Sequence, residues 1–349
     1  MAGCTGLLVV GWGIKDSIKD VVSIQYGQIF NYDYTIALEN SKASEEILDV
    51  LGDDLYNTKN VPYMSYSSKV YLEDSEPTIN VIVVDARDGS EILSLRETDK
   101  TTPLRIRNGG VIVSEKFAKN NGISAGDYIT FESASGLKAK AKVNAVCELY
   151  FQHYIIISED QYDLLFSEPV KYTAIAVKNS EESASEIAAQ VKDIDGYSSI
   201  ADFSSFEKQF NTMLEALNYI ILVIIVTAGS LAFVVLINLT QVNISERIRE
   251  IATLKVLGFH NAEVSSYIYK EIFLLTLIGA AAGLPLGVVE HRFIMTQINM
   301  DMIMFGTQVK LLSFVYAFAV TIVFTLIVML IMLKDLKRVE MVESLKSVE

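Results

Sequence analysis

The sequence predicts an α-helical membrane protein that also carries a folded α+β domain outside the membrane. Three segments, residues 219–239, 272–289 and 311–333, contain no charged residue, and roughly 20 apolar residues in a helix cross the ~30 Å hydrocarbon core of a bilayer. The acidic charge lies elsewhere, because residues 15–213 contain 19 Lys and Arg against 32 Asp and Glu. Within that acidic part, short apolar runs alternate with turn residues, as in soluble α+β domains.

The first fourteen residues are apolar but too short to cross a bilayer as a helix. A cleavable signal peptide would need a basic start and a small-residue cleavage site, and a lipoprotein signal, suggested by Ala2-Gly3-Cys4, would need an apolar stretch before it. We therefore interpret residues 1–14 as a partial transmembrane helix, the truncated end of a span, followed by a charged helix from Lys15. The chain has only two cysteines, Cys4 and Cys147, which excludes a disulfide framework.

Residues 15–213 are predicted to form the α+β extracytoplasmic domain. Strand–helix units are expected on both sides of a β-rich block at residues 62–146, and Ser158 with Gln161 is expected to form a capping box. The expected strands are residues 32–38, 70–72, 81–84, 111–113, 128–131, 137–146, 154–157 and 172–177, and the expected helices are residues 44–51, 115–121, 159–166 and 180–192.

Residues 203–217 lead from this domain into the first uncharged segment. Phe203, Phe206, Phe210 and Leu217 recur at helical spacing. An amphipathic core helix would show the same spacing, but the run continues without a break into residues 219–239. We therefore predict one continuous helix, in which a stalk precedes the span. The transmembrane domain is assigned to residues 214–349.

The connector between the first two spans, residues 243–260, reads NISERIREIATLKVLGFH and is expected to form a helix along the membrane face. Ile244, Ile248 and Ile251 share one helical face, and Gly258 is a natural C-cap that ends the helix. Two ion pairs are expected at i,i+3 spacing, Arg247 with Glu250 and Glu246 with Arg249. A charged helix that is attached to a span at each end is suited to binding a partner protein.

The second span, residues 272–289, carries Gly279, Gly283 and Gly287 at four-residue intervals. Small residues at this spacing let helix backbones approach closely in lipid, so a helix-packing face is predicted. The general enrichment of glycine in membrane helices is the alternative explanation. Residues 334–349 are expected to form an interfacial helix.

Basic residues set the expected topology. The 243–271 connector and the tail after residue 333 carry eight Lys and Arg, whereas the connector between the last two spans carries two. The positive-inside rule then places the first connector and the tail in the cytoplasm. Residues 15–213 and 290–310 are consequently expected outside.

No motif for catalysis is present in the sequence. It lacks GxxxxGK[ST], GxSxG and HExxH, and its three histidines lack metal-ligand spacing. No basic patch indicates nucleic-acid binding. The sequence therefore predicts a non-enzyme without cofactor or metal. Glu290-His291-Arg292 could serve as a gate or ligand site, but we favour a water-facing helix end.

Residues 244–287, ISERIREIATLKVLGFHNAEVSSYIYKEIFLLTLIGAAAGLPLG, resemble the FtsX-like, or MacB-type, permeases of bacterial ABC transporters. These permeases share a charged loop of the form ER-REI…K-LG, a following helix and a glycine-rich span. Residues 109–158 look like the family's MacB-type extracytoplasmic domain, and residues 11–33 look like the end of its first span and the strand after it. The incomplete first span resembles the C-terminal repeat of a longer permease, or an N-terminally truncated chain.

The resemblance implies a permease subunit in the bacterial plasma membrane, crossing the lipid bilayer several times. It implies a separate ABC ATPase that docks on the connector and, through ATP hydrolysis, moves the outer domain, together with a second permease copy or repeat. The residues expected at the ATPase-coupling loop are Glu246, Arg247, Arg249, Glu250, Lys255 and Gly258.

Two other classes of protein fit the sequence less well. A membrane-anchored sensor, whose outer domain would bind a ligand, is disfavoured because the two segments expected in the cytoplasm, residues 243–271 and 334–349, are too short to hold an output domain. A membrane-bound hydrolase is disfavoured because no nucleophile or metal motif is found. The permease subunit is the preferred interpretation.

Overall fold

The computed structural model describes residues 1–52, 59–73, 75–178, 182–259, 261–298 and 300–337. For some of these only the backbone is described: the side chains of residues 203–211, 213–218, 220–221, 243, 248, 252, 255, 261–262, 265, 267–268 and 332–337 are not. The chain divides into two compact units. Residues 19–213 with 300–305 form the α+β unit, and residues 1–18, 214–299 and 306–349 form the membrane unit.

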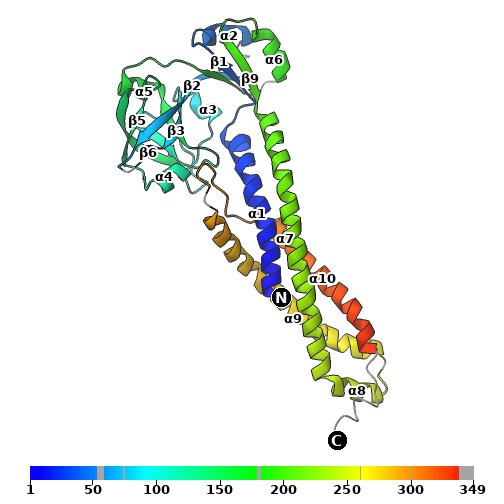
Figure 1. Cartoon of the computed structure of the whole chain (residues 1–349). Helices are drawn as coiled ribbons and strands as arrows, with labels where there is room; N and C mark the ends of the chain where they lie inside the picture. Colours follow the sequence, from blue (N-terminus) through cyan, green and yellow to red (C-terminus); the bar gives the residue numbers. More distant parts are fainter. Residues whose placement is uncertain (53–58, 74, 179–181, 260, 299, 338–349) are drawn as a thin grey trace. The chain divides into compact units, whose positions relative to one another are not determined.

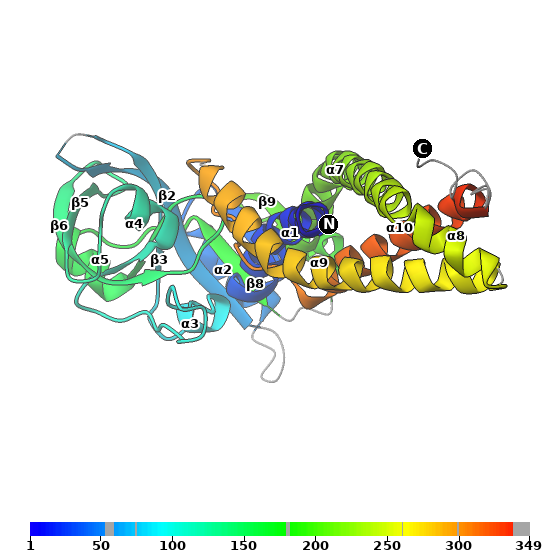
Figure 2. The ribbon, with the colours of Figure 1, turned by 90° about the horizontal axis from the view of Figure 1, so that it is seen from below.

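A nine-stranded sheet organises the α+β unit, and six of its strands close into a ring in the order β3-β7-β4-β6-β5-β2, with β2 pairing back to β3. Figure 2 shows these strands curving around one core. Closure depends on the thirteen-residue strand β2, which pairs with β8, β3 and β5 in turn along its length. The ring strands are β2 (Lys59–Tyr71), β3 (Thr78–Val84), β4 (Val111–Ser114), β5 (Tyr128–Glu132), β6 (Lys138–Cys147) and β7 (Tyr154–Ser158).

The core of the ring follows from alternation along its strands. Ile129 and Phe131 on β5 are buried, whereas Tyr128 is 60% exposed, because successive strand side chains point to opposite faces. Helix α5 (Glu159–Phe166) packs on this core, where Phe166 stacks edge-on against Phe131 at 5.3 Å between ring centroids. Helix α4 (Glu115–Asn120) also contributes to it.

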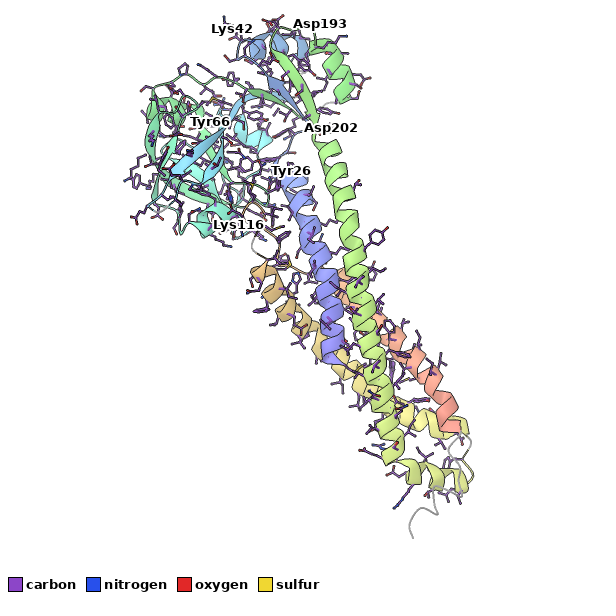
Figure 3. The ribbon with its side chains drawn as sticks, viewed as in Figure 1. Tyr26, Lys42, Tyr66, Lys116, Asp193 and Asp202 are labelled. Carbon is purple, nitrogen blue, oxygen red and sulfur yellow. The ribbon has the colours of Figure 1, made fainter. Side chains whose placement is uncertain are left out.

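The remaining strands, β1 (Tyr34–Leu38), β8 (Ala174–Lys178) and β9 (Tyr197–Asp202), extend the sheet beyond the ring and are covered by two helices (Figure 1). These helices are α2 (Ala43–Leu51) and α6 (Ala184–Val191), and Ile47 and Ile187 from them share a buried cluster with Ile36. Ser183 and Glu186 form a complete capping box at the start of α6. Strand β9 ends at Asp202, directly before α7 (Figure 3).

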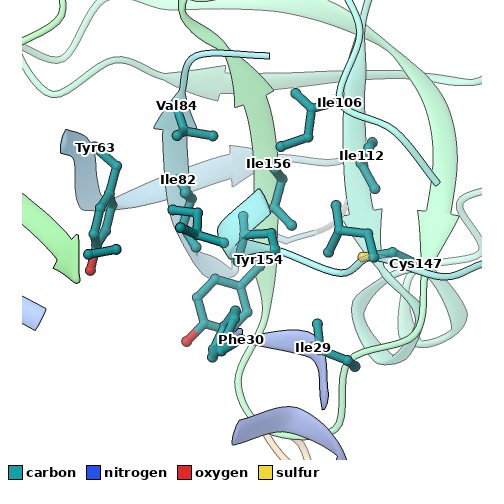
Figure 4. Close-up of a cluster of buried hydrophobic side chains, with 14 of the residues drawn as sticks. Ile29, Phe30, Tyr63, Ile82, Val84, Ile106, Ile112, Cys147, Tyr154 and Ile156 are labelled. Atoms are coloured by element: carbon teal, nitrogen blue, oxygen red, sulfur yellow. The ribbon is translucent and has the colours of Figure 1, made fainter. Parts of the chain in front are cut away.

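A third buried cluster joins the ring to the chain that follows the first helix. A π-helical turn, η1 (Gln25–Ile29), places Ile29 and Phe30 against β3 and β7 (Figure 4). The rings of Phe30 and Tyr154 meet edge-on at 5.8 Å between centroids. The short helix α3 (Gly89–Ile92) adds Ile92 to the same cluster.

The described part of the membrane unit is mainly helical. Three helices are long and apolar enough to cross a membrane, at Leu222–Glu246, Tyr269–Gln297 and Leu311–Ile331. They lie within α7 (Phe203–Glu246), α9 (Asn261–Gln297) and α10 (Leu311–Lys337), with the short helix α8 (Ile248–Val256) between α7 and α9. The first helix, α1 (Ala2–Ile24), contributes its residues 2–18.

Most predicted strands and helices are present, and the differences have physical causes. The β-rich block also contains β7, because parallel pairing with β3 brings it into the ring. Strand β9 was not predicted, since half of its residues are exposed and none is fully buried. Ser158 caps α5 as expected, but the Gln161 side chain instead accepts a hydrogen bond from the Gly109 N–H, so the predicted capping box is incomplete.

Helix α7 is a single helix over the predicted stalk and span. The side chains of Phe203, Phe206, Phe210 and Leu217 lie outside the description, so their predicted packing stays a prediction. The predicted interfacial helix of the tail lies largely outside the described residues, which end at Lys337.

Candidate functional site

The connector folds as a short helix between two spans. Helix α7 continues to Glu246, Arg247 occupies a turn, and α8 begins at Ile248. The predicted start at Ile244 is therefore wrong, because the span helix runs seven residues beyond the predicted span, from Leu239 to Glu246. Figure 1 shows α8 following the end of α7.

Gly258 ends the connector helix, as predicted. Its φ of +93° lies in the left-handed region, and the Phe259 N–H donates to the Leu254 carbonyl at 3.2 Å, which is half of a Schellman motif. A Cβ at Gly258 would meet nothing within 4 Å. The backbone conformation, and not crowding, is therefore the reason for glycine here.

One face of α8 packs against the chain's own spans. Ile251 is 2% exposed and shares a buried cluster with Ile244, Val264 and Ile272, and Leu254 packs against this cluster. These contacts fasten α8 to the end of α7 and to the start of α9. The side chain of Ile248, expected on the same face, lies outside the description.

Arg247 fastens the connector a second time. Its two terminal nitrogens lie 2.5 and 2.8 Å from the Glu271 carboxylate on α9, a bidentate ion pair. The expected i,i+3 partner was Glu250, but Arg247 sits in a turn, where helical spacing no longer decides which side chains are neighbours. A half-exposed ion pair adds little to the free energy of unfolding. Its two parallel hydrogen bonds nevertheless fix the orientation of the Arg247 side chain relative to Glu271.

The opposite side of the connector is open. Glu246, Arg249 and Glu250 are exposed, as expected for residues that meet a partner, and the Lys255 side chain lies outside the description. Glu250 and Thr253 of α8 line a cavity of about 620 Å³ with Glu263 and Val264 of α9.

Three exposed apolar residues of the connector were missed by the sequence reasoning. Val256, Leu257 and Phe259 are 61%, 70% and 50% exposed. The sequence does contain a signal for them, because these three large apolar side chains follow the last buried position of the amphipathic pattern. Together with the exposed charges they form a mixed apolar and charged surface, which we call the connector surface: Glu246, Arg249, Glu250, Thr253, Val256, Leu257 and Phe259.

The three glycines of α9 lie against α1. A Cβ at Gly283 would lie 2.5 Å from the Ala2 carbonyl oxygen, and one at Gly287 would lie 2.8 Å from the Gly6 carbonyl oxygen. A Cβ at Gly279 would lie 2.8 Å from the Cβ of Met1. The structure thus places the predicted glycine face at a close crossing of two helices.

Polar side chains of α1 also contact the spans within the membrane unit. The Asp16 carboxylate accepts from the Lys310 N–H at 3.0 Å and from the Ser313 hydroxyl at 2.6 Å, at the start of α10. The Ser17 hydroxyl lies 3.0 Å from His291 Nε2. His291 is fully buried, so the predicted water-facing helix end is wrong at this residue. Packing against α1, which sequence spacing does not reveal, is the cause.

The α+β unit contains a junction at Tyr150–His153. The buried Gln25 side chain accepts from the N–H groups of Tyr150 and Phe151, at 2.8 and 2.6 Å, and donates to the Phe151 carbonyl at 2.9 Å. The segment Met300–Phe305 contacts the same stretch, because the Gln152 N–H donates to the Met302 carbonyl at 2.7 Å. This junction therefore ties residues after α1 and residues between α9 and α10 to the ring.

His153 and Cys147 lie near this junction and are buried. Burial lowers the pKa of His153, while Asp301, whose carboxylate lies 3.6 Å from His153 Nε2, opposes that shift. Burial raises the pKa of the Cys147 thiol to about 12. Among the described residues, no group of three or more His, Cys, Asp or Glu side chains is arranged to hold a metal ion.

Comparisons with known proteins find a family match over the part of the chain that contains the connector. Residues 219–341 match the family described as FtsX-like permease C-terminal. Among curated proteins, no sequence matches the chain.

Solved structures of extracytoplasmic domains are similar to part of the chain. The periplasmic region of MacB from Actinobacillus actinomycetemcomitans is 14% identical over 54% of this chain and 95% of its own, with a TM-score of 0.33. The extracellular domain of the ABC-type transporter YknZ from Gram-positive bacteria is 13% identical over 49% of this chain and 99% of its own, also with a TM-score of 0.33.

The family match covers α8, the spans and the connector surface, and three helices are long and apolar enough to cross a membrane. Residues 219–341 therefore match the FtsX-like permease C-terminal family, and this match together with the three helices supports a multi-pass protein of the bacterial cell membrane.

Proposed function

We propose that this chain is the permease subunit of an ABC transporter, and that it couples ATP hydrolysis by a separate ATPase to movement of its α+β unit outside the membrane. The observation that carries the proposal is the two-sided character of α8. One face is buried on the spans through Ile251, and the other presents the connector surface. A force applied to that surface is passed to α7 and α9 instead of being absorbed by a loose loop.

The chemistry of the connector surface suits a protein partner. Exposed Val256, Leu257 and Phe259 supply apolar contact area, and buried apolar side chains supply most of the affinity at interfaces. Arg249 and Glu250 flank them, and charges at an interface rim set encounter rate and register. A second permease copy or repeat is part of the proposal, because closure of a dimeric ATPase needs two docking sites.

Co-expression with the ABC ATPase of the same source and purification from membranes tests the proposal. Leu257→Asp and Phe259→Asp should abolish co-purification and ATPase stimulation in proteoliposomes, since each buries a charge in the contact. Leu164→Asp, at an exposed position of α5 in the α+β unit, is the matched control and should co-purify normally. Normal assembly of both connector variants would refute docking at this surface.

The role of Arg247 needs a separate experiment, because Arg247 pairs with Glu271 within the chain. Arg247→Glu breaks that pair, whereas Arg247→Glu combined with Glu271→Arg restores it with the charges exchanged. Recovery of ATPase binding in the double variant assigns Arg247 a positioning role. Persistent loss would mean that Arg247 itself contacts the ATPase.

A further inference from the structure

The α+β unit holds all of its arginines in one place. Residues 19–213 contain four arginines, at positions 87, 96, 105 and 107. All four line a single open cavity of about 790 Å³ beside α3, a volume within the range of small-ligand sites. The lining contains no Asp or Glu, although residues 15–213 have 13 more acidic than basic residues. The cavity is therefore a positive site in an acidic domain.

The backbone directs these side chains into the cavity. Ile106 is 4% exposed and belongs to the buried cluster of Figure 4. Because side chains alternate along extended chain, Arg105 and Arg107 on either side of Ile106 point away from that core. Gly89 allows α3 to lie close by, since a Cβ there would be 2.5 Å from Val84 and 3.0 Å from Ile106.

One arginine is held in place. Arg96 Nε lies 3.1 Å from the carboxylate of Glu148, which is 1% exposed, and the Arg96 guanidinium donates to Gln28 at 3.3 Å. The Tyr150 hydroxyl donates to the same Glu148 carboxylate at 2.5 Å. Arg96 is thus a fixed wall of the cavity whose charge is already balanced.

The nearby carboxylates are engaged elsewhere. Asp88 and Glu91 pair with Lys59 at 3.0 and 2.6 Å. The Asp85 carboxylate accepts from the N–H groups of Arg87 and Asp88, and the Arg87 charge also lies near it. The Asp99 carboxylate accepts from the turn at Thr101–Thr102.

Arg105 and Arg107 differ from these groups. Within the described part of the chain, neither side chain has a hydrogen bond or an ion pair, and both are exposed. Each planar guanidinium can donate two parallel hydrogen bonds to an oxyanion. The positive charges of these two guanidinium groups are not balanced by a carboxylate, and an anion bound in the cavity would balance them.

We propose that this arginine cavity binds a phosphate group of a ligand. A phosphate has three or four oxygens and up to two charges, so it can accept from Arg87, Arg105 and Arg107 together, whereas one carboxylate has only two oxygens. The phosphate comes either from a soluble phosphorylated molecule or from a phospholipid headgroup. The proposal is independent of ATPase docking, because every residue of the cavity lies in the α+β unit.

The test uses the full chain in nanodiscs of phosphatidylcholine at low ionic strength, where screening is weak. One arm titrates inorganic pyrophosphate by calorimetry. The other measures co-sedimentation with phosphatidylcholine vesicles that contain or lack phosphatidylglycerol. Saturable binding in the first arm alone identifies a soluble ligand, binding to anionic vesicles alone identifies a lipid headgroup, and either result supports the site.

The variant Arg105→Glu with Arg107→Glu should weaken binding about 100-fold, since loss of each charge-assisted contact weakens it about tenfold. Lys140→Glu with Lys142→Glu is the matched control, because these exposed lysines have the same spacing and the same change in net charge. The control should bind within about twofold of the parent. Arg105→Lys with Arg107→Lys keeps the charge but loses the fork, and should bind more weakly than the parent and more tightly than the glutamate variant.

Absence of binding in both arms overturns the proposal. Equal weakening in the arginine and lysine reversals also overturns it, because the effect would then reflect the overall charge of the domain. Binding by the Arg105→Glu, Arg107→Glu variant that is as tight as that of the parent overturns the proposal too.

Discussion

Replacement of Gln25 by alanine should loosen the junction between the chain after α1 and the ring of the α+β unit. The Gln25 side chain is fully buried and makes three hydrogen bonds to the backbone of Tyr150 and Phe151. Alanine leaves two N–H groups and one carbonyl without these partners. Most buried backbone polar groups in folded proteins are paired, so this loss is costly.

The magnitude follows from these bonds. A net contribution of about 1 kcal/mol for each gives a total of about 3 kcal/mol, with more if the groups remain unsatisfied. A local opening equilibrium shifted by about 3 kcal/mol corresponds to roughly 100-fold faster exchange of the protected amides. The effect should be confined to residues 149–152 and to the turn η1.

Hydrogen exchange followed by mass spectrometry on the full chain measures this directly. Gln190→Ala is the matched control, because Gln190 is exposed and makes a single side-chain bond, to Glu182 at 2.7 Å, and it should leave exchange at residues 149–152 unchanged. Unaltered protection of these amides in the Gln25 variant would refute the reasoning. Equal loss of protection in β5 would also refute it, since the change would then be global unfolding.

Three further predictions concern packing, pH and topology. Gly283→Ala should lower the free energy of unfolding in detergent by about 1–3 kcal/mol through overpacking. Gly3→Ala should be neutral, because a Cβ at Gly3 meets nothing within 4 Å. Equal stability of the two variants would contradict the close helix crossing. The pKa of His153 is lowered in the folded state, so the unfolded state binds the proton first as pH falls. The free energy of unfolding should therefore decline below about pH 6.5. His153→Gln should reduce that decline, and a pH profile of thermal unfolding that is unchanged in this variant would contradict the prediction. In a chain freed of Cys4 and Cys147, an impermeant thiol reagent on intact cells should label Lys140→Cys but not Glu250→Cys, as the basic residues of the connector and tail require, and the reverse pattern would invert the topology.

The sequence by itself determined the elements whose signals are local. Uncharged runs of about the length that crosses a bilayer identified the three spans, since the length and composition of a segment decide whether it can lie in lipid. Alternation and turn residues located most strands, and Gly258 was recognised as a helix end from its place after an amphipathic pattern. The charged connector followed by a glycine-rich span carried the family resemblance, which the family match over residues 219–341 confirms.

Tertiary structure decided what depends on contacts between distant residues. The ring closes because β2 pairs with three strands in turn, and no local pattern encodes that register. Arg247 lies in a turn and pairs with Glu271, 24 positions away in the sequence. His291 is buried because Ser17 of α1 lies against it. Arg105 and Arg107 read as ordinary surface residues in the sequence, and only the fold, by burying Ile106 between them and turning the nearby carboxylates to other partners, gathers all four arginines of the domain around one cavity.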